Sequence, residues 1–218
     1  PVKELCDQYD CKYFYEPSVS IIEEIRSSYV QHCTHQYVLF VDPDERYPPD
    51  LFDDIGKAID NYAPSSLSLP YNYFLGSQLI TGGIWSRQNI KRLFAKSALL
   101  MTSDIHYDLT TNQPSSSRTI YRTDKNPIIH LWAPSRFSLL RKHIRYLDHE
   151  GQSMWKRGYR YSRRKHVLAN AKAFLNSYLL KTGFLDLTNG WYLTKLYTWY
   201  IHNRWLRLKD YQHKTDVR

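Results

Sequence analysis

The chain has 218 residues, of which 42% are hydrophobic and 15% are aromatic. This length is enough for one well-filled domain with a helical extension, and the composition excludes a globally disordered chain. No apolar run approaches the roughly 18–20 residues that a membrane-spanning helix needs, and no segment has the pattern of a signal peptide. The three cysteines match no zinc-binding spacing, so we expect free thiols at Cys6, Cys11 and Cys33.

The net charge of +9 is unevenly distributed along the chain. Residues 1–135 hold 12 Lys and Arg against 16 Asp and Glu, a net −4, whereas residues 136–218 hold 18 against 5, a net +13. A basic region after an acidic body predicts a polyanionic partner, either an anionic membrane surface or nucleic acid. No helix-turn-helix, RNA-recognition or zinc module is recognisable, so nucleic acid is not the expected partner.

The first third of the chain has an α/β pattern. Helical spacing of apolar residues predicts a helix over 18–33, and the short apolar run over 36–41 predicts a buried strand. Pro48 and Pro49 then mark the start of a second helix. Its expected inner face carries Leu51, Phe52, Ile55 and Ile59.

The remainder divides into a region of short strands and a helical region. Turn residues, most clearly Gly82-Gly83, separate the strands. We expect these strands over 66–75, 77–85, 90–94, 119–122 and 128–132. After Pro134 the apolar spacing is helical to the end of the chain. We expect these helices over 136–157, 161–181 and 190–209.

An acidic loop follows the first predicted strand directly, with Asp42, Pro43, Asp44 and Glu45 in succession. Open α/β sheets bind ligands at the carboxyl ends of their strands. Two carboxylates held by a stiff turn suit Mg²⁺ or Mn²⁺, whose other positions go to water and phosphate oxygens. Such a cation offsets the charge that builds on a departing nucleoside diphosphate. The alternative is a solvated acidic turn before a helix.

A series of segments resembles family 2 glycosyltransferases. The stretch 37–46 (YVLFVDPDER), followed by PDL at 49–51, resembles their strand and metal loop. The nearest branch is the lipopolysaccharide-core glucosyltransferase type, with its LDADER stretch and PEL helix start. Further segments resemble that branch in the same order, and together they cover roughly residues 20–205: NYFLG at 72–76, GG at 82–83, KRLF at 91–94, IHL at 129–131 and KTGFLDLTNG at 181–190.

The resemblance implies the GT-A fold, a mixed Rossmann-like α/β sheet, truncated here at its N-terminus. It divides the chain into a partial GT-A catalytic domain, residues 1–135, and a helical membrane-associating region, residues 136–218. Judged by what βαβ units require, roughly 40 residues of the donor pocket are expected to precede Pro1. The resemblance therefore does not imply activity for residues 1–218 by themselves.

The same resemblance implies an inverting, metal-dependent sugar transfer. The donor is a nucleotide-diphospho-sugar, most simply a UDP-sugar, and the acceptor is a lipopolysaccharide-core or other lipid-linked or surface glycan. The enzyme is expected to be cytoplasmic and peripheral at the inner face of the membrane. Asp42 and Asp44 are the expected ligands of Mg²⁺ or Mn²⁺. Glu45 is expected to support the loop on the donor diphosphate side.

An inverting transferase also needs a carboxylate to take the proton of the acceptor hydroxyl. The branch has His-Glu where this chain has IHYD at 105–108, so Asp108 is the candidate base and Asp104 the reserve. For each, the alternative is an ordinary loop aspartate.

Four other residues are candidate ligand contacts. Arg92 is suited to a diphosphate oxygen, and His130 to the diphosphate or the metal. His106 is a candidate for the metal shell or the acceptor side, and Trp85 for the acceptor side by stacking on a sugar. The alternatives are an exposed strand arginine, satisfied structural histidines, and a core or rim tryptophan.

The C-terminal region is both basic and aromatic. Residues 156–165 (KRGYRYSRRK) carry six cations in ten positions, and the last predicted helix mixes Trp and Tyr with Lys and Arg. This composition is typical of a helix lying in the plane of an anionic membrane. The alternative is a helical cap on the sheet with a solvated basic face. A second functional hypothesis is a non-catalytic basic module that binds a membrane or nucleic acid and carries a vestigial or truncated transferase core.

Overall fold

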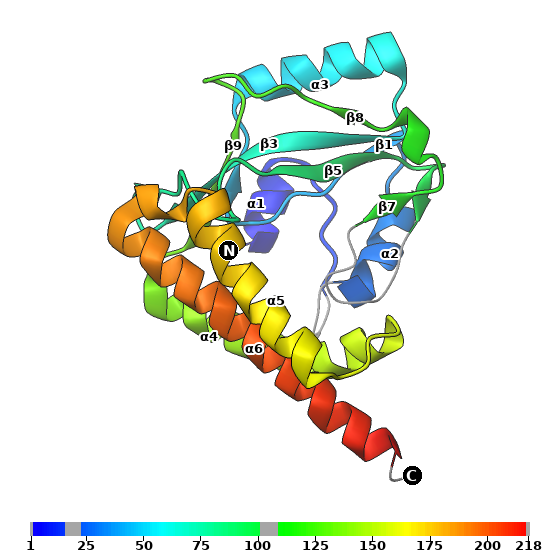
Figure 1. Ribbon diagram of the computed structural model, residues 1–218. Coiled ribbons are helices and arrows are strands. Elements are labelled where there is room, and N and C mark those ends of the chain that lie inside the picture. Colours follow the sequence, from blue (N-terminus) through cyan, green and yellow to red (C-terminus); the bar gives the residue numbers. More distant parts are fainter. Residues whose placement is uncertain (1, 16–22, 101–108, 217–218) are drawn as a thin grey trace.

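The protein has a mixed α/β fold with a curled mixed sheet and a group of C-terminal helices. The structure is a computed structural model that describes residues 2–15, 23–100 and 109–216. In Figure 1 the helix α3 lies along one side of the sheet, and the helices α4, α5 and α6 lie together on the other. The mixed α/β class predicted from the sequence is therefore confirmed.

Within the described residues, the main path of the sheet has the strand order β1-β5-β3-β9-β2. The pair β3–β9 is parallel and the other pairs along this path are antiparallel. The strands of the path are β1 (Tyr37–Leu39), β2 (Glu45–Arg46), β3 (Ser66–Leu75), β5 (Asn89–Ala95) and β9 (Ile128–Ala133).

Shorter strands lie off this path. Both β4 and β8 pair with β3, whereas β6 and β7 pair with each other in a separate two-stranded sheet. Their bounds are β4 (Gln78–Leu79), β6 (Leu99–Leu100), β7 (Thr110–Thr111) and β8 (Arg118–Thr119). The predicted strand over 77–85 is thus reduced to β4, because the chain turns at Gly82-Gly83 to meet the C-terminal helices.

The central strand β3 has the bounds predicted from the sequence. It is buried along most of its length, because it has neighbours on both edges and elements pack on both of its faces. Leu67, Leu69 and Tyr71 have no exposed surface. The main core gathers around them, with Leu51 and Ile55 from α3, Leu93 from β5, Ile128 from β9, Leu139 from α4, and Leu193 and Leu196 from α6.

The strand before the acidic loop lies at the edge of the sheet. Of the predicted 36–41 run, only Tyr37–Leu39 forms β1, which pairs with β5 alone within the described residues. Val38 is buried, but Val41 is exposed. The predicted buried strand is therefore observed only in part: Val38 is buried and Tyr37 and Leu39 are half-buried, in a strand at the edge of the sheet.

The helix α3 (Pro49–Tyr62) begins where the sequence predicted, with Pro49 in its first turn. It buries Leu51, Ile55 and Ala58, which recur at helical spacing. Phe52 was expected on the same face but is exposed. A position directly after Leu51 is turned away from the core by about 100° of helix rotation, and there Phe52 meets the ring of Tyr47 at 6.1 Å.

The predicted C-terminal helices are present with small changes in their ends. α6 begins earlier than the predicted residue 190 and continues further, and a π-helical turn, η2, follows α5. No helix in the described ranges is both long enough and apolar enough to cross a membrane. The bounds are α1 (Val2–Gln8), α2 (Glu23–Gln31), α4 (Arg136–Lys156), α5 (Arg163–Leu175), α6 (Leu187–Asp216), η1 (Pro114–Ser116), η2 (Asn176–Leu180) and η3 (Gly183–Asp186).

A buried polar contact joins α4 to α6. Glu150 on α4 accepts hydrogen bonds from the Tyr200 hydroxyl at 2.6 Å and from Arg204 Nε at 2.7 Å. Burial raises the pKa of Tyr200, which keeps its hydroxyl protonated as a donor. Tyr200 and Trp205 are buried. Part of the aromatic set predicted for a membrane boundary therefore packs inside the helical group.

A second buried carboxylate joins the helices to the sheet. Asp186 in η3 accepts hydrogen bonds from the Thr81 amide at 3.0 Å, the Thr81 hydroxyl at 2.5 Å and the Gly82 amide at 2.8 Å. We call this contact the Asp186 clasp. Gly82 is required there, because a Cβ atom at this position would overlap the carbonyl of Thr182. The segments GG at 82–83 and KTGFLD at 181–186, read separately in the sequence, are thus one structural feature.

Candidate functional site

The acidic loop connects β1 to β2, and strand pairing fixes both of its ends. At one end the Phe40 amide donates to the carbonyl of Arg92 at 2.9 Å. At the other end Glu45 pairs with His130 in the β2–β9 ladder, and the Leu131 amide donates to the carbonyl of Asp44 at 2.8 Å. The loop is therefore held at Arg92 in the middle of β5 and at His130 and Leu131 in the middle of β9.

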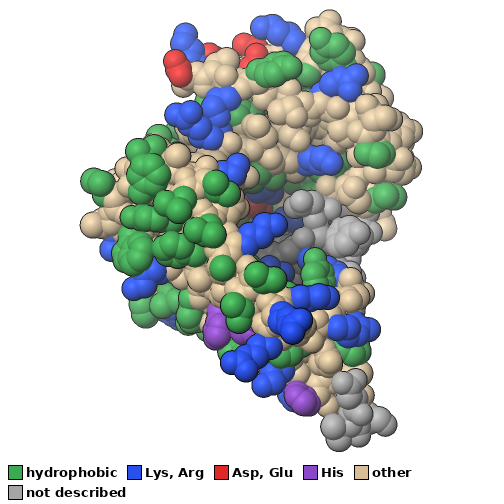
Figure 2. All heavy atoms as spheres, in the orientation of Figure 1, with side chains coloured by type: hydrophobic (Ala, Val, Ile, Leu, Met, Phe, Trp, Pro, Cys, Tyr) green, Lys and Arg blue, Asp and Glu red, His purple; other side chains and the backbone are tan. Residues whose placement is uncertain are grey.

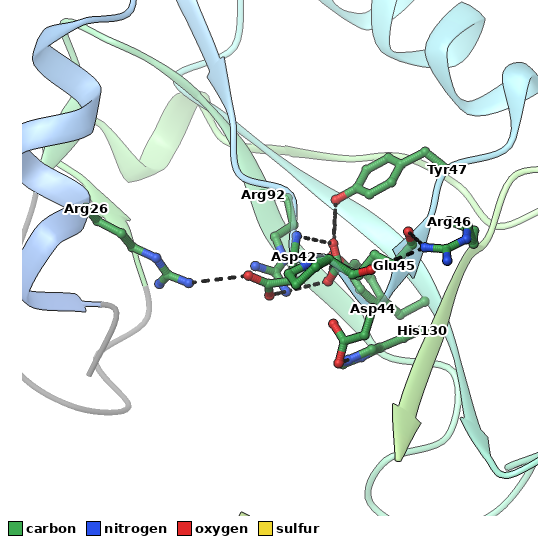
Figure 3. Close-up of polar contacts among 10 residues, drawn as sticks. Arg26, Asp42, Asp44, Glu45, Arg46, Tyr47, Arg92 and His130 are labelled. Atoms are coloured by element: carbon green, nitrogen blue, oxygen red, sulfur yellow. Dashed lines mark hydrogen bonds and ion pairs between the residues drawn. The ribbon is translucent and has the colours of Figure 1, made fainter. Parts of the chain in front are cut away.

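Glu45 is the buried centre of the site, as Figure 3 shows. Its side chain has 0% exposure, and one carboxylate oxygen accepts from the Tyr47 hydroxyl at 2.8 Å and from the Asp42 amide at 3.2 Å. The other oxygen accepts from the Tyr71 hydroxyl at 3.0 Å and from Arg92 Nη2 at 2.6 Å. Since these donors occupy both oxygens, Glu45 shapes the loop and does not face a ligand.

Arg92 links the buried acid to the outer one. Its Nη2 also donates to Asp42 Oδ2 at 2.8 Å, and its Nε donates to the Tyr71 hydroxyl at 2.7 Å. Burial by itself lowers the pKa of Arg92, but Tyr71, Asp42 and Glu45 outweigh it and leave that pKa above its ordinary value. Arg92 is therefore a permanent cation inside the site, and the alternative of an exposed strand arginine is wrong.

The hydroxyls around this cation stay protonated. Burial raises the pKa of Tyr47 and of Tyr71 above the ordinary tyrosine value. Burial likewise raises the pKa of Tyr73 to about 12, although the charge of Arg92 opposes the change. Each tyrosine is therefore a donor at neutral pH, and Tyr47 and Tyr71 use that proton on Glu45.

Asp44 and His130 form the outer part of the site. His130 Nε2 lies 3.2 Å from Asp44 Oδ2, and the imidazole packs on the Tyr73 ring at a centroid distance of 4.8 Å. Burial lowers the pKa of His130, against the opposite effect of Asp44 and Glu45. The other ring nitrogen, Nδ1, is buried and has no hydrogen-bond partner in the described part of the chain.

The two outer carboxylates suit a hard divalent cation. The Asp42 and Asp44 side chains keep 32% and 35% of their surface exposed, so both are open to solvent. Asp42 Oδ1 lies 3.9 Å from Arg26 on α2, and Asp44 Oδ1 has no hydrogen bond within the described residues. Mg²⁺ in proteins commonly takes one or two carboxylates and fills its other positions with water and phosphate. The residues present therefore fit such a cation.

The described residues do not form a complete set of metal ligands. Within the described residues, no three His, Cys, Asp or Glu side chains converge as a ready ligand set. Arg92 and Arg26 compete with a cation for Asp42, and His130 shares Asp44. A cation here would consequently depend on oxygens from a ligand, such as a diphosphate.

Several predicted residues are not joined to this site by any described contact. Asp104, His106 and Asp108 lie outside the described residues. Trp85 is half-buried and packs on Trp132 at a centroid distance of 4.9 Å and on Tyr197 of α6 at 5.6 Å. These contacts give Trp85 a packing role between the sheet and the helices.

Sequence reasoning missed the tyrosines that brace the loop. Tyr47 follows Glu45 by two residues, but Tyr71 is 26 residues away in sequence and reaches Glu45 only through the sheet. The one signal that points to Tyr71 is a polar-tipped aromatic in the middle of a buried strand, since a buried tyrosine hydroxyl usually needs a partner.

Arg26 was also missed. It lies on α2, where it stands over the Phe40 ring at 5.7 Å as well as near Asp42.

A comparison of the chain with models of known protein families finds no match.

Proposed function

We propose that the protein is an inverting, metal-dependent glycosyltransferase of the GT-A type. The donor is a nucleotide-diphospho-sugar such as a UDP-sugar, and the acceptor is a lipopolysaccharide-core or other lipid-linked glycan hydroxyl at the membrane. The observation that carries the proposal is the pair of solvent-exposed carboxylates of Asp42 and Asp44. The loop that holds them is stabilised by the buried ion pair between Glu45 and Arg92. The ordered family-like segments in the sequence support the proposal.

In this proposal the acceptor oxygen attacks the anomeric carbon of the donor sugar. The bond from that carbon to the diphosphate oxygen breaks, the nucleoside diphosphate leaves with the electron pair, and the acceptor proton passes to a carboxylate. Asp108, with Asp104 as the reserve, is the proposed base. A cation held by Asp42 and Asp44 supplies positive charge beside the departing diphosphate.

The buried contact between Glu45 and Arg92 offsets negative charge in the acidic loop. A loop that carries three carboxylates repels itself, and Arg92 with Arg26 offsets much of that charge. Arg92 is shared between Glu45 and Asp42, whereas Asp44 contacts His130 through one oxygen and has no hydrogen bond to the other within the described residues. This division of roles is what a two-carboxylate cation site needs.

Binding of Mn²⁺ to the full-length protein provides the first test, by electron paramagnetic resonance of free Mn²⁺ with and without UDP. We expect UDP to strengthen Mn²⁺ binding, and we expect Asp44→Asn to weaken it by tenfold or more, on the order of 1.4 kcal/mol. The matched control is Asp60→Asn, an exposed aspartate on α3.

The second test is release of UDP from UDP-sugars by the same full-length protein in the presence of lipopolysaccharide-core acceptors. The proposal requires turnover that depends on Mg²⁺ or Mn²⁺ and that is lost in Asp44→Asn. Metal binding and turnover that are unchanged in Asp44→Asn would contradict the role of the acidic loop.

A second candidate function is a basic binding module. It is favoured by the exposed basic segment 156–165, in which Arg160 stacks on Trp155 at 3.6 Å from the ring centroid. Comparison of vesicle binding with oligonucleotide binding over a salt series tests it. A protein that binds oligonucleotides with a steep salt dependence and releases no UDP would favour this candidate.

A further inference from the structure

The surface of the C-terminal helices has a groove lined by exposed hydrophobic side chains. Four large hydrophobic side chains from η3 and α6 are exposed there: Phe184, Leu187, Trp191 and Trp199. They line a groove of about 960 Å³, whose other wall is formed by Leu140 and Ile144 of α4. We call these six residues the apolar face. In Figure 2 hydrophobic side chains gather over this part of the molecule, where Figure 1 shows the start of α6 with α4 behind it.

The same groove is bordered by positive charge. Arg136 and Lys195 are among its lining residues, none of which is acidic. Lys195 stands over the Trp191 ring at 5.7 Å, and Arg136 stands over the Tyr192 ring at 5.1 Å. Neither cation forms an ion pair with a carboxylate within the described residues, so both charges are available to a partner.

Two of the acids near the groove in sequence are buried, whereas a third, Asp148 on α4, is exposed and lies 3.8 Å from Arg207. Asp186, between Phe184 and Leu187, is buried in the clasp with Thr81 and Gly82. Glu150 is buried against Tyr200 and Arg204. The lining of the groove therefore holds no acidic residue and has cations beside exposed aromatic rings.

Leu187 combines an exposed side chain with an unfavourable backbone conformation. Its side chain is 77% exposed although its backbone φ is +48°, a conformation that favours glycine. An exposed leucine gains little from packing to offset that strain. We take this combination as support for a contact of the side chain outside the protein.

We propose that the apolar face docks on the surface of an anionic lipid bilayer. Trp191, Trp199 and Leu187 enter the boundary between headgroups and acyl chains, where amphipathic aromatic rings are favoured. Arg136 and Lys195 then lie against the anionic headgroups. The charge of residues 136–218, 18 basic against 5 acidic, favours an anionic surface over a neutral or basic one.

This inference specifies how the protein would bind the membrane at which the proposed function places it. It rests on the proposed function for that location only. The groove also bears on that function through α4. Leu140 and Ile144 of α4 line the groove, and the same helix packs against β9, the strand that carries His130. One helix therefore contacts both the proposed lipid surface and the surroundings of the acidic loop.

The test is co-sedimentation of the full chain with vesicles, in the absence of metal and donor. One set contains phosphatidylcholine alone, and the other contains equal parts of phosphatidylcholine and phosphatidylglycerol. We expect binding to the anionic vesicles only. We expect Leu187→Gly to weaken that binding by about tenfold and Lys195→Gln by about fivefold. Because the assay needs no turnover, it separates this inference from the proposed transferase activity.

Leu187→Gly also excludes an indirect effect through misfolding. Glycine relieves the positive φ, so the variant should unfold at the same or a higher temperature while it binds vesicles less tightly. Matched controls remove an exposed aromatic ring and an exposed cation elsewhere: Tyr121→Ala, at a side chain that is 88% exposed, and Lys57→Gln on α3. Both should bind vesicles like the unaltered chain.

Three results would overturn the inference. The first is equal vesicle binding by Leu187→Gly and Tyr121→Ala. The second is a dimer that forms without lipid and is lost in Leu187→Gly, which would assign the face to a second copy of the chain. The third is binding of an oligonucleotide, in place of anionic vesicles, that the same substitutions abolish.

Discussion

The guanidinium of Arg92 donates to the carboxylate of Glu45 over 2.6 Å, and that carboxylate has no exposed surface. A buried ion pair of this kind contributes little net stability, but loss of one partner leaves an uncompensated charge. The contact therefore makes the shape of the acidic loop depend on a residue in β5.

Arg92→Ala should lower the free energy of unfolding by about 3–5 kcal/mol, because Glu45 would remain buried without its cation. Urea denaturation of the variant and the unaltered chain measures the difference. Lys57→Ala, at an exposed position on α3, is the control and should change that energy by less than about 0.5 kcal/mol. A small effect of Arg92→Ala would mean that Glu45 is protonated or solvated.

Asp186→Ala should lower the free energy of unfolding by about 3 kcal/mol, because the Thr81 and Gly82 amides would lose a buried acceptor. Hydrogen exchange gives the local readout: those two amides should exchange faster in the variant. Asp210→Ala, at an exposed position on α6, should leave both unchanged. Slow exchange that persists in Asp186→Ala would show that another group holds the clasp.

Two glycine-to-alanine substitutions should act in opposite directions. Gly82→Ala should destabilise the protein by several kcal/mol, since the added methyl group overlaps the backbone carbonyl of Thr182. Gly56 lies inside α3 with open space around the position of a Cβ atom, so Gly56→Ala should stabilise by about 1 kcal/mol. Thermal unfolding compares the two variants, and a change of the same sign in both would contradict this reading.

Stability should fall in mild acid partly through His166. Its Nε2 lies 3.1 Å from Nδ1 of His202, and burial, followed by the charge of His202, lowers its pKa below 6.5. The unfolded chain then binds the proton more readily than the folded one, so stability present above pH 6.5 is lost as the pH falls through the folded-state pKa.

Chemical denaturation of His166→Gln over a pH series tests this dependence. The unaltered chain should lose more unfolding free energy than the variant between about pH 7 and pH 5. His213→Gln, at an exposed position near the end of α6, is the control and should follow the unaltered chain. Identical slopes for all three proteins would exclude His166 as a source of the acid sensitivity.

Local sequence signals predicted the elements of the fold well. Pro49 marked the start of α3, and the apolar run 66–75 matched β3 at both ends. The sequence-based prediction of the helices did not name Ser135, which caps α4 by accepting a hydrogen bond from the Ser138 amide at 3.1 Å, but this cap is also a local signal that the sequence contains. These features depend on residues within one or two turns of each other, which periodicity and turn chemistry describe directly.

The parts that were not predicted depend on contacts between distant residues. Glu45 and Arg92 are 47 residues apart, so nothing local shows that one neutralises the other. The same holds for the edge position of β1, which follows from sheet order and not from its own apolar residues. Burial of Tyr200 and exposure of Trp199, neighbours on α6, depend on where α4 packs.

The Asp186 clasp closes a long stretch of chain, since Thr81 and Asp186 are 105 residues apart. Closing a loop of that length costs about 4 kcal/mol of chain entropy. The contact is therefore gained only when the sheet and the helical group are both formed, and the two should unfold in one cooperative transition. Any surface that binds the helices in their folded form would by mass action also raise the stability of the sheet that carries the acidic loop.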